Sequence, residues 1–291
     1  MDFNALQAFT EVARCQSFSQ AAEALFITQP AISKRITVLE RELGVRLFNR
    51  INRSVSLTEA GRSLLPRVQA LNSEIEAIRR YAADLSGDVS GILSMATSHH
   101  IGLRRLPPVL KHFNQHYPKV QLDIRFEDSE QACLAVERGE LEIAIATLPA
   151  HIPEQLETHT IWVDKLQIVT APDHPLQNQQ PVSLTTLSTH PCVLPSKDTF
   201  TYQILRDKLQ QLKVELNVHM STNYIETLKM LVSSGFGWSL LPHTMLDDSI
   251  AAIETDLLLE RRLGSVVHRK RTLSNAAVAM LETLEQFQDY T

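Results

Sequence analysis

The 291-residue sequence contains few of the residues that mark enzymes with nucleotide or metal chemistry. Its nine glycines form no GxGxxG or P-loop pattern, and no GxSxG or HExxH pattern is present. Its three cysteines, Cys15, Cys133 and Cys192, form no CxxC or Cys/His metal spacing, and an odd number argues against a disulfide framework. We expect small buried thiols, because a redox pair of Cys133 and Cys192 would need the two side chains to be adjacent. No cofactor and no metal are therefore expected.

No segment for export or membrane insertion is expected from the sequence. No apolar run reaches the roughly 18 residues of a membrane-spanning helix. The N-terminus, MDFNALQAFTEVA, is amphipathic and contains acidic residues, unlike a signal peptide. A cytoplasmic protein without a membrane partner is expected, and a receptor for a transported solute is disfavoured.

Residues 17–58 follow the pattern of two short helices around a tight turn. Ser19 is expected to N-cap a helix that runs to Ala24, and Thr28 to N-cap the next helix. Pro30 falls in the first turn of that second helix, where its missing N–H is tolerated. The expected buried turn residues are Leu25, Phe26 and Ile27, and the expected buried face of the second helix is Ile32, Ile36, Leu39 and Leu43. Gly44 then ends the helix, which completes a helix-turn-helix pattern.

Polar side chains at the start of the second helix predict contacts with DNA. Gln29 and Ser33 lie one turn apart and can exchange hydrogen bonds with base edges, and Lys34 can reach a guanine or a phosphate. The alternative is the solvated face of an ordinary amphipathic helix. The preceding helix, the caps and the following segment all agree with a DNA-reading module, which favours the first interpretation.

After Gly44, two short strand-like pieces flank a polar turn and predict a β-hairpin wing. Arg50 and Arg53 are placed there to meet phosphates or a minor groove. At this point the sequence closely resembles the LysR-type transcriptional regulators, and the resemblance extends along the whole chain. The residues that carry it are Ala21-Ala22, Thr28-Gln29-Pro30-Ala31-Ile32-Ser33, Leu39-Glu40, Leu43-Gly44-Val45-Arg46-Leu47-Phe48, Arg50 and Leu57-Thr58-Glu59-Ala60-Gly61.

The charge balance is modest for a chain that binds DNA. The whole chain has a formal net charge of −5, while residues 1–86 carry 11 Lys and Arg against 9 Asp and Glu. A dimer must therefore concentrate its positive charge locally, and a shallow salt dependence of DNA binding is expected.

Thr58 is expected to cap a long helix with a narrow apolar seam. The seam residues are spaced by alternating steps of four and three, which favours a dimerisation helix over a helix packed within one chain; they are Leu64, Val68, Leu71, Ile75, Ile78, Ala82 and Leu85. The predicted domains are a winged helix-turn-helix domain (1–58), a linker and dimerisation helix (59–87) and a regulatory domain (88–291).

Alternating strand and helix patterns from residue 91 to residue 146 predict an α/β unit with a mainly parallel sheet. Short strands are expected at 165–171 and 266–269. The resemblance implies two α/β subdomains arranged as in a periplasmic binding protein, the first about 91–163 plus 266–291 and the second about 164–265. It also implies an effector cleft between them and a homodimer or homotetramer that binds an imperfect inverted repeat in double-stranded DNA.

Small polar residues follow several predicted strands, where α/β sheets commonly bind ligands. The candidate effector-binding residues are Thr97, Ser98, His99, Ser129, Thr147, Ser196, Thr199 and Thr222. Any one hydroxyl could be an ordinary helix N-cap, so the argument rests on their joint position. With His99 and Lys197 available, the set favours a small anion or carboxylate, and the low aromatic content of 6% disfavours a large flat ligand.

The function predicted from the sequence is a transcriptional regulator controlled by a small-molecule effector, with RNA polymerase as a further partner. The alternative is an enzyme carried on the α/β domain behind a DNA-binding head, which the absent catalytic motifs disfavour. Metal binding by His99 and His100 is weakly supported, because no acidic or cysteine partner lies at a suitable spacing.

Overall fold

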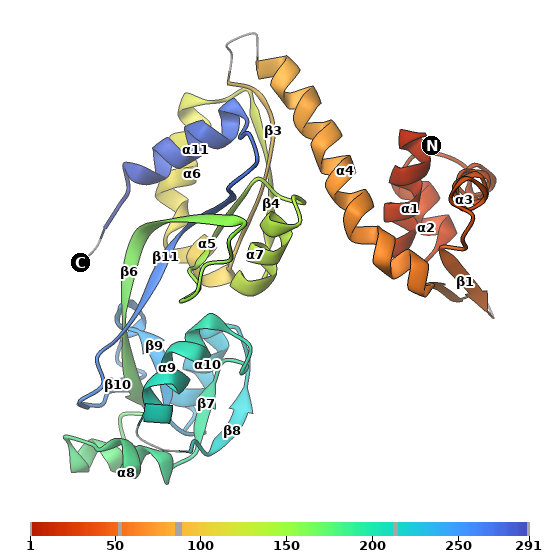
Figure 1. The fold of residues 1–291 in the computed structure, drawn as a ribbon. Coiled ribbons are helices and arrows are strands. Elements are labelled where there is room, and N and C mark those ends of the chain that lie inside the picture. The colour runs from red at the N-terminus through yellow and green to blue at the C-terminus, as the bar shows by residue number, and fades with distance from the viewer. Residues whose placement is uncertain (1, 52–53, 85–88, 212–214, 290–291) are drawn as a thin grey trace. The chain divides into compact units, whose positions relative to one another are not determined.

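The computed structural model describes residues 2–51, 54–84, 89–211 and 215–289. The chain forms two compact units, an N-terminal unit with the first four helices and a C-terminal unit with the later elements (Figure 1). The N-terminal unit consists of α1 (Phe3–Cys15), α2 (Phe18–Ala24), α3 (Gln29–Leu43), β1 (Phe48–Ile51), β2 (Ser54–Leu57) and α4 (Glu59–Asp84). Strands β1 and β2 pair antiparallel, so the predicted wing is present beside the helix-turn-helix.

Helix α2 begins earlier than predicted, at Phe18. Ser17, and not Ser19, is the N-cap, and its hydroxyl accepts a hydrogen bond from the backbone N–H of Gln20 at 3.4 Å. Starting the helix at Phe18 buries that ring in the core, where it packs edge-on against Phe48 with ring centroids 5.9 Å apart. The aromatic contact explains why the helix begins earlier than the sequence pattern indicated.

Two residues that the sequence placed in the core are exposed. Ile32, Ile36 and Leu39 of α3 are fully buried, as predicted. Leu43, however, is the last residue of the helix before the chain turns at Gly44, and 37% of it is exposed. Phe26, in the turn between α2 and α3, is 96% exposed, so the prediction of a wholly buried turn is wrong.

The wing is fixed to the helices by hydrogen bonds and by one close approach. The Glu40 carboxylate on α3 accepts bonds from the N–H groups of Leu47 at 2.7 Å and Phe48 at 3.2 Å. The Thr58 hydroxyl accepts a bond from Gly61 N–H at 3.0 Å, which confirms it as the cap of α4. A Cβ on Gly61 would lie 2.3 Å from the carbonyl oxygen of Leu47, so α4 can pass the wing only with glycine there.

The C-terminal unit contains a mixed seven-stranded sheet in the order β10-β6-β11-β5-β3-β4, and β9 also pairs with β6. Its strands are β3 (Gly91–Thr97), β4 (Val120–Phe126), β5 (Ile143–Thr147), β6 (Leu156–Thr170), β9 (Ser239–Pro242), β10 (Ala251–Ala252) and β11 (Leu259–His268). A separate parallel pair is formed by β7 (Cys192–Leu194) and β8 (Val218–Ser221). The remaining elements are α5 (His99–Arg104), α6 (Leu106–His116), α7 (Ser129–Glu137), η1 (Pro175–Gln179), α8 (Leu184–Ser188), α9 (Phe200–Gln211), α10 (Ile225–Ser233), η2 (His243–Met245) and α11 (Asn275–Glu285).

The sheet is parallel only in part. Strands β4, β3 and β5 are parallel neighbours, as predicted, but β6 and β11 form a long antiparallel ladder. The short strands expected at 165–171 and 266–269 are therefore the second parts of two longer strands. Both strands run between lobe I, which holds β3 to β5, α5 to α7 and α11, and lobe II, which holds α8 to α10 and β7 to β9 (Figure 1).

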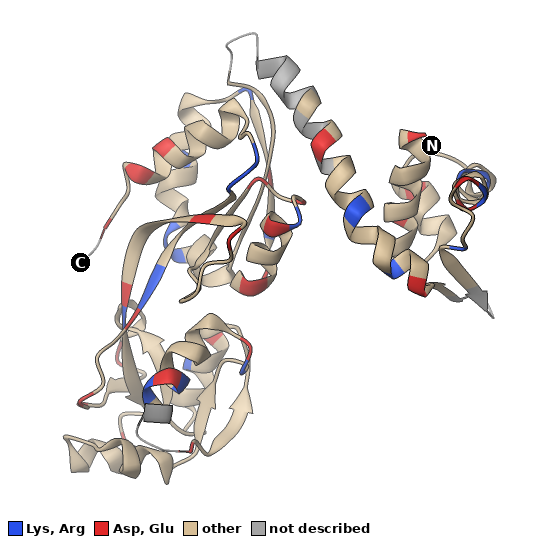
Figure 2. Ribbon diagram, viewed as in Figure 1, with Lys and Arg blue, Asp and Glu red and all other residues tan. Residues whose placement is uncertain are grey.

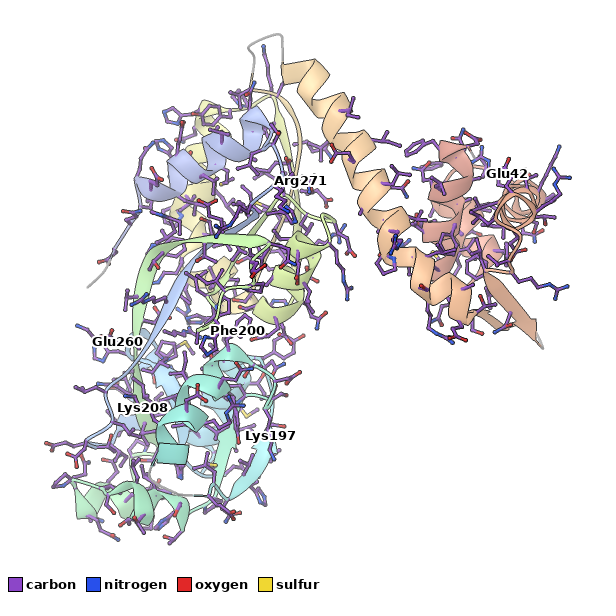
Figure 3. All side chains as sticks on the ribbon, in the orientation of Figure 1. Glu42, Lys197, Phe200, Lys208, Glu260 and Arg271 are labelled. Atoms are coloured by element: carbon purple, nitrogen blue, oxygen red, sulfur yellow. The ribbon has the colours of Figure 1, made fainter. Side chains whose placement is uncertain are left out.

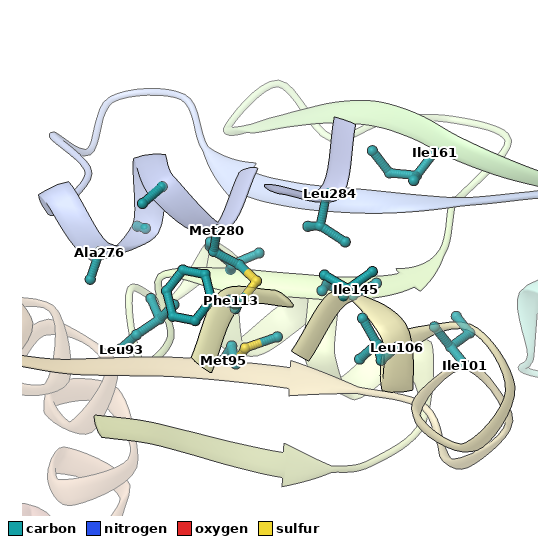
Figure 4. Packing of buried hydrophobic residues seen from close by; sticks show 14 of the residues in the cluster. Leu93, Met95, Ile101, Leu106, Phe113, Ile145, Ile161, Ala276, Met280 and Leu284 are labelled. Carbon is teal, nitrogen blue, oxygen red and sulfur yellow. The ribbon is translucent and has the colours of Figure 1, made fainter. Parts of the chain in front are cut away.

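Each lobe has its own hydrophobic core. In lobe I the side chains of Leu93 and Met95 on β3 meet Phe113 of α6 and Met280 of α11 (Figure 4). In lobe II, Trp238 is fully enclosed and its indole N–H donates to the carbonyl oxygen of Leu187 at 2.9 Å. Within the described ranges, no helix is long and apolar enough to cross a membrane.

Candidate functional site

The predicted DNA-contacting residues gather at the start of α3. Thr28 is the N-cap by position but forms no side-chain capping bond, so its hydroxyl is free for another partner. Thr28, Gln29 and Pro30 are exposed. Gln29 Nε2 donates to Ser33 Oγ at 3.2 Å, which places the amide and the hydroxyl side by side on one helix face. This face presents both donors and acceptors, as base-edge recognition requires.

The cationic part of this surface is less completely described. Lys34 is exposed on α3, a helix that carries both basic and acidic residues (Figure 2). Arg50 lies on β1, but its side chain is outside the described residues, and Arg53 lies wholly outside them. The predicted phosphate contacts of these two arginines therefore remain predictions.

The apolar seam of α4 divides into two parts. Leu64 and Val68 pack against the core of the N-terminal unit itself. Further along the helix, Leu71 is 42% exposed and Ile78 is 61% exposed. Leu85 lies outside the described residues, as does the side chain of Ala82. The first seam residues, Leu64 and Val68, thus pack within one chain, which was the alternative to a dimerisation helix. The exposed apolar side chains, Leu71 and Ile78, lie further along the helix.

A small cavity lies where α5, α7, α9 and α10 begin, bounded on one side by β11. The volume open to the centres of water molecules is about 60 Å³, which suits a ligand of a few heavy atoms. Its lining residues are Ser98, His99, His100, Asp128, Ser129, Glu130, Thr147, Pro195, Thr199, Thr201, Asn223, Tyr224, Ile225, Leu240 and Arg261.

Five of the eight predicted effector-binding residues line this cavity: Ser98, His99, Ser129, Thr147 and Thr199. The other three, Thr97, Ser196 and Thr222, are not among the lining residues. Thr97 is fully buried, and its hydroxyl donates a hydrogen bond to the carbonyl oxygen of Ser98 at 3.4 Å.

Lys197, which supported the prediction of an anion, lines a different hollow beside Tyr202 and Arg206. Figure 3 labels Lys197 and also Phe200, the first residue of α9. An anion bound in the cavity would therefore need a cation other than Lys197.

Two hydrogen bonds cross the cavity from lobe II to lobe I. Asn223 Nδ2 donates to Asp128 Oδ2 at 2.7 Å. The backbone N–H of Phe200 donates to Glu130 Oε1. Burial raises the pKa of the Glu130 carboxyl, and the bond from Phe200 opposes that shift. Both acidic side chains at this edge of the cavity are thus occupied by donors from the opposite lobe.

The cation at the cavity is Arg261, which the sequence analysis missed. It is 4% exposed and lies directly across the β6–β11 ladder from Asp164. Arg261 Nε and Nη2 both donate to Asp164 Oδ2, at 3.0 and 2.7 Å, and Arg105 Nη2 donates to Oδ1 at 2.7 Å. Although burial opposes ionisation, the two arginines hold the pKa of Asp164 below its usual range. Two cations surround one anion, so this cluster has an excess of one positive charge.

His100 lines the cavity beside this charge cluster. It is 5% exposed, and Nδ1 lies 3.6 Å from Glu226 Oε1, beyond hydrogen-bonding distance. Burial and the nearby Arg261 lower the pKa of His100 to about 4, while Asp164 and Glu226 oppose that shift. The imidazole is therefore neutral at pH 7 and can offer one donor and one acceptor.

The cysteines give no support for a redox pair. Cys133 and Cys192 are free and belong to the separate cores of lobe I and lobe II. Burial raises the pKa of each thiol to about 12, which removes the reactive thiolate at neutral pH. The described part of the chain also contains no group of three or more metal-ligating side chains.

Both the N-terminal and the C-terminal segments of the chain match known protein families. Residues 3–62 match the family model "Bacterial regulatory helix-turn-helix protein, lysR family", and residues 86–288 match "LysR substrate binding domain". The HTH-type transcriptional regulator BbuR of Bordetella bronchiseptica is 30% identical over 87% of this chain and 77% of its own. A regulator of Azotobacter vinelandii encoded in the ibpB-leuC intergenic region is 59% identical, over 37% of this chain and 75% of its own.

Solved structures share the fold at lower identity. A full-length OxyR variant from Pseudomonas aeruginosa superposes with a TM-score of 0.70 at 22% identity, over 99% of this chain and 94% of its own. Full-length CbnR complexed with its target DNA superposes with a TM-score of 0.67 at 18% identity, over 99% of this chain and 100% of its own.

Proposed function

Because the chain belongs to the LysR family of bacterial transcriptional regulators, we propose that a small anion or carboxylate, bound in the cavity beside Arg261, controls its binding to DNA. The family is one of DNA-binding regulators with an effector-binding domain, and its members are not enzymes. The proposal adds to this the chemical class of the effector and the residues that hold it.

The guanidinium of Arg261 carries the proposal. Nε and Nη2 are bonded to Asp164, which leaves Nη1 without a bond to any described residue. An anion accepting from Nη1 would also balance the excess positive charge of the cluster with Arg105 and Asp164. Ser98 and Thr147 also line this space, and their hydroxyls can complete the hydrogen bonds of an anion, whereas the Thr199 hydroxyl already donates to the carbonyl oxygen of Ser196 at 2.7 Å.

The cavity lining also contains two carboxylates, those of Asp128 and Glu130. Asp128 accepts from Asn223 and Glu130 accepts from Phe200, so each already receives one hydrogen bond across the cavity. A cationic ligand that approached the second oxygen of either carboxylate would also meet the guanidinium of Arg261.

The test is calorimetry and thermal unfolding of the full chain with sulfate, phosphate, acetate and malonate, against ammonium and acetamide as cationic and neutral counterparts. A bound anion at 100 times its dissociation constant stabilises the fold by about 2.7 kcal/mol. Ser98→Ala removes a cavity hydroxyl that caps nothing and should weaken binding about tenfold. Ser196→Ala, which removes a hydroxyl outside the cavity lining, is the matched control. Equal responses to anions and to ammonium or acetamide would overturn the assignment of charge.

In the N-terminal unit, the residues proposed to contact base edges are Thr28, Gln29, Pro30 and Ser33. Those proposed to contact phosphates are Lys34, Arg50 and Arg53. The exposed Leu71 and Ile78 support pairing of two chains through α4, which would bring two heads onto an inverted repeat. A dimer or tetramer in the cytoplasm that contacts RNA polymerase completes the proposed function.

A further inference from the structure

The turn between α2 and α3 holds a phenylalanine in a conformation that favours glycine. Phe26 has φ +53°, and its N–H donates to the carbonyl oxygen of Glu23 at 3.1 Å. The next N–H, of Ile27, donates to Ala22 at 3.0 Å. This pair of bonds is a Schellman motif with Phe26 at its left-handed position, where glycine or asparagine is usual because a side chain crowds the backbone.

The ring of Phe26 contributes nothing to the core of the N-terminal unit. It is 96% exposed, more than any other large apolar side chain in the described ranges. Its neighbours Leu25 and Ile27 both pack against that core. A strained backbone and an exposed aromatic ring both disfavour phenylalanine here, and no ring contact within the described residues compensates for them.

The position of Phe26 indicates what that partner is. Gln29 lies three residues further on, so the two Cα atoms are at most about 11 Å apart. The DNA major groove is about 12 Å wide, and a recognition helix inserts its N-terminal residues into it. When the start of α3 occupies the groove, a residue this close to Gln29 is near enough for its side chain to reach the groove edge and the backbone of one strand.

We propose that Phe26 is a DNA-contact residue whose ring packs against apolar atoms of the DNA, a thymine 5-methyl or a deoxyribose, next to the bases that α3 reads. The inference rests on the DNA-binding function of the N-terminal unit. It explains why a residue that disfavours the free fold occupies this turn, since burying the ring against DNA recovers apolar contact only in the complex.

The test measures stability and DNA affinity in the same variants of the full chain. Phe26→Gly and Phe26→Asn relieve the left-handed strain, so their melting temperatures should rise by about 2–8 °C. Their affinity for the best duplex that the wild type selects from a randomised pool should fall about tenfold. Phe26→Tyr keeps the ring and should keep the affinity. Gln16→Gly, at the other non-glycine left-handed position among the described residues (φ +49°), is the matched control and should gain stability without losing affinity.

Deoxyuridine at single thymine positions of the selected duplex then separates the two sources of apolar contact. If the contact is a thymine methyl, one replacement weakens the wild type and leaves Phe26→Gly unaffected. If it is deoxyribose, no replacement distinguishes the two proteins, and Phe26→Gly loses affinity equally on random duplexes.

Unchanged affinity of Phe26→Gly overturns the proposal, as does a lower melting temperature or a loss confined to self-association in sedimentation. If the wild type selects no duplex, the proposed function fails instead.

Discussion

Neutral His100 at the cavity makes the C-terminal unit sensitive to acid. In the unfolded chain the imidazole takes up a proton below its ordinary pKa of 6.5, whereas in the folded chain the pKa is about 4. Between these values the unfolded state binds the extra proton, so the free energy of unfolding falls as pH falls from about 6.5 to about 4. Each pKa unit is worth about 1.4 kcal/mol, so the full loss is about 3 kcal/mol.

The measurement is guanidinium unfolding at closely spaced pH values between 4 and 8, followed by tryptophan fluorescence. Both tryptophans of the chain, Trp162 and Trp238, are buried in the C-terminal unit, so the signal reports that unit alone. The comparison is with His100→Asn, whose amide replaces Nδ1 but does not titrate. Wild type should lose about 3 kcal/mol relative to this variant as pH falls.

Other groups change stability with pH but cancel in the difference between the two proteins. Asp164, with a lowered pKa, stabilises the fold above about 3.8 and loses this effect at lower pH. Glu130, with a raised pKa, acts in the opposite direction because the fold holds its proton longer as pH rises. His99→Asn, at the exposed neighbouring position, is the control and should retain the wild-type slope. Parallel curves for wild type and His100→Asn would refute the reasoning.

Two further predictions concern DNA binding and assembly. Gln29→Ala should weaken binding to a selected duplex by roughly 1–3 kcal/mol and binding to random DNA only slightly, because contacts to bases and not to phosphates are lost. Equal losses of affinity for the two duplexes in competition binding would show that Gln29 does not read bases. The double variant Leu71→Asp, Ile78→Asp should separate two chains paired through α4, since it would place charges in an apolar contact. An unchanged sedimentation coefficient of the full chain at low concentration would show that the interface lies elsewhere.

The N-terminal unit was predictable because its signals are local. Caps, a tight turn and helical spacing act within a few residues, so Ile32, Ile36 and Leu39 were correctly assigned to the core. The errors arose where tertiary contacts decide. Phe48 draws Phe18 into the core and moves the start of α2, and no local rule foretold an exposed Phe26 at a left-handed position.

The cavity was predictable only in part, through four hydroxyl residues and His99. Strand ends that face a cleft carry recognisable small polar residues, and five of the eight candidates line the space. Arg261 was missed because the strand was started at residue 266, whereas β11 begins at Leu259. With the longer strand, Leu259, Arg261 and Leu263 share one buried face, and an arginine on that face is the signal that would have identified it.

The antiparallel pair of β6 and β11 has a mechanical consequence. The chain passes between the lobes twice, and both passages belong to one hydrogen-bonded ribbon. The lobes cannot slide apart along it without breaking the ladder, so a change in their spacing has to be taken up as twist or bend. The ladder register shifts between Leu263 and Gly264, where a Cβ would lie 2.0 Å from the carbonyl oxygen of His159. Arg261 lies two residues before Leu263 on the same strand, so an anion bound at its guanidinium, as we propose, would act directly on this ribbon.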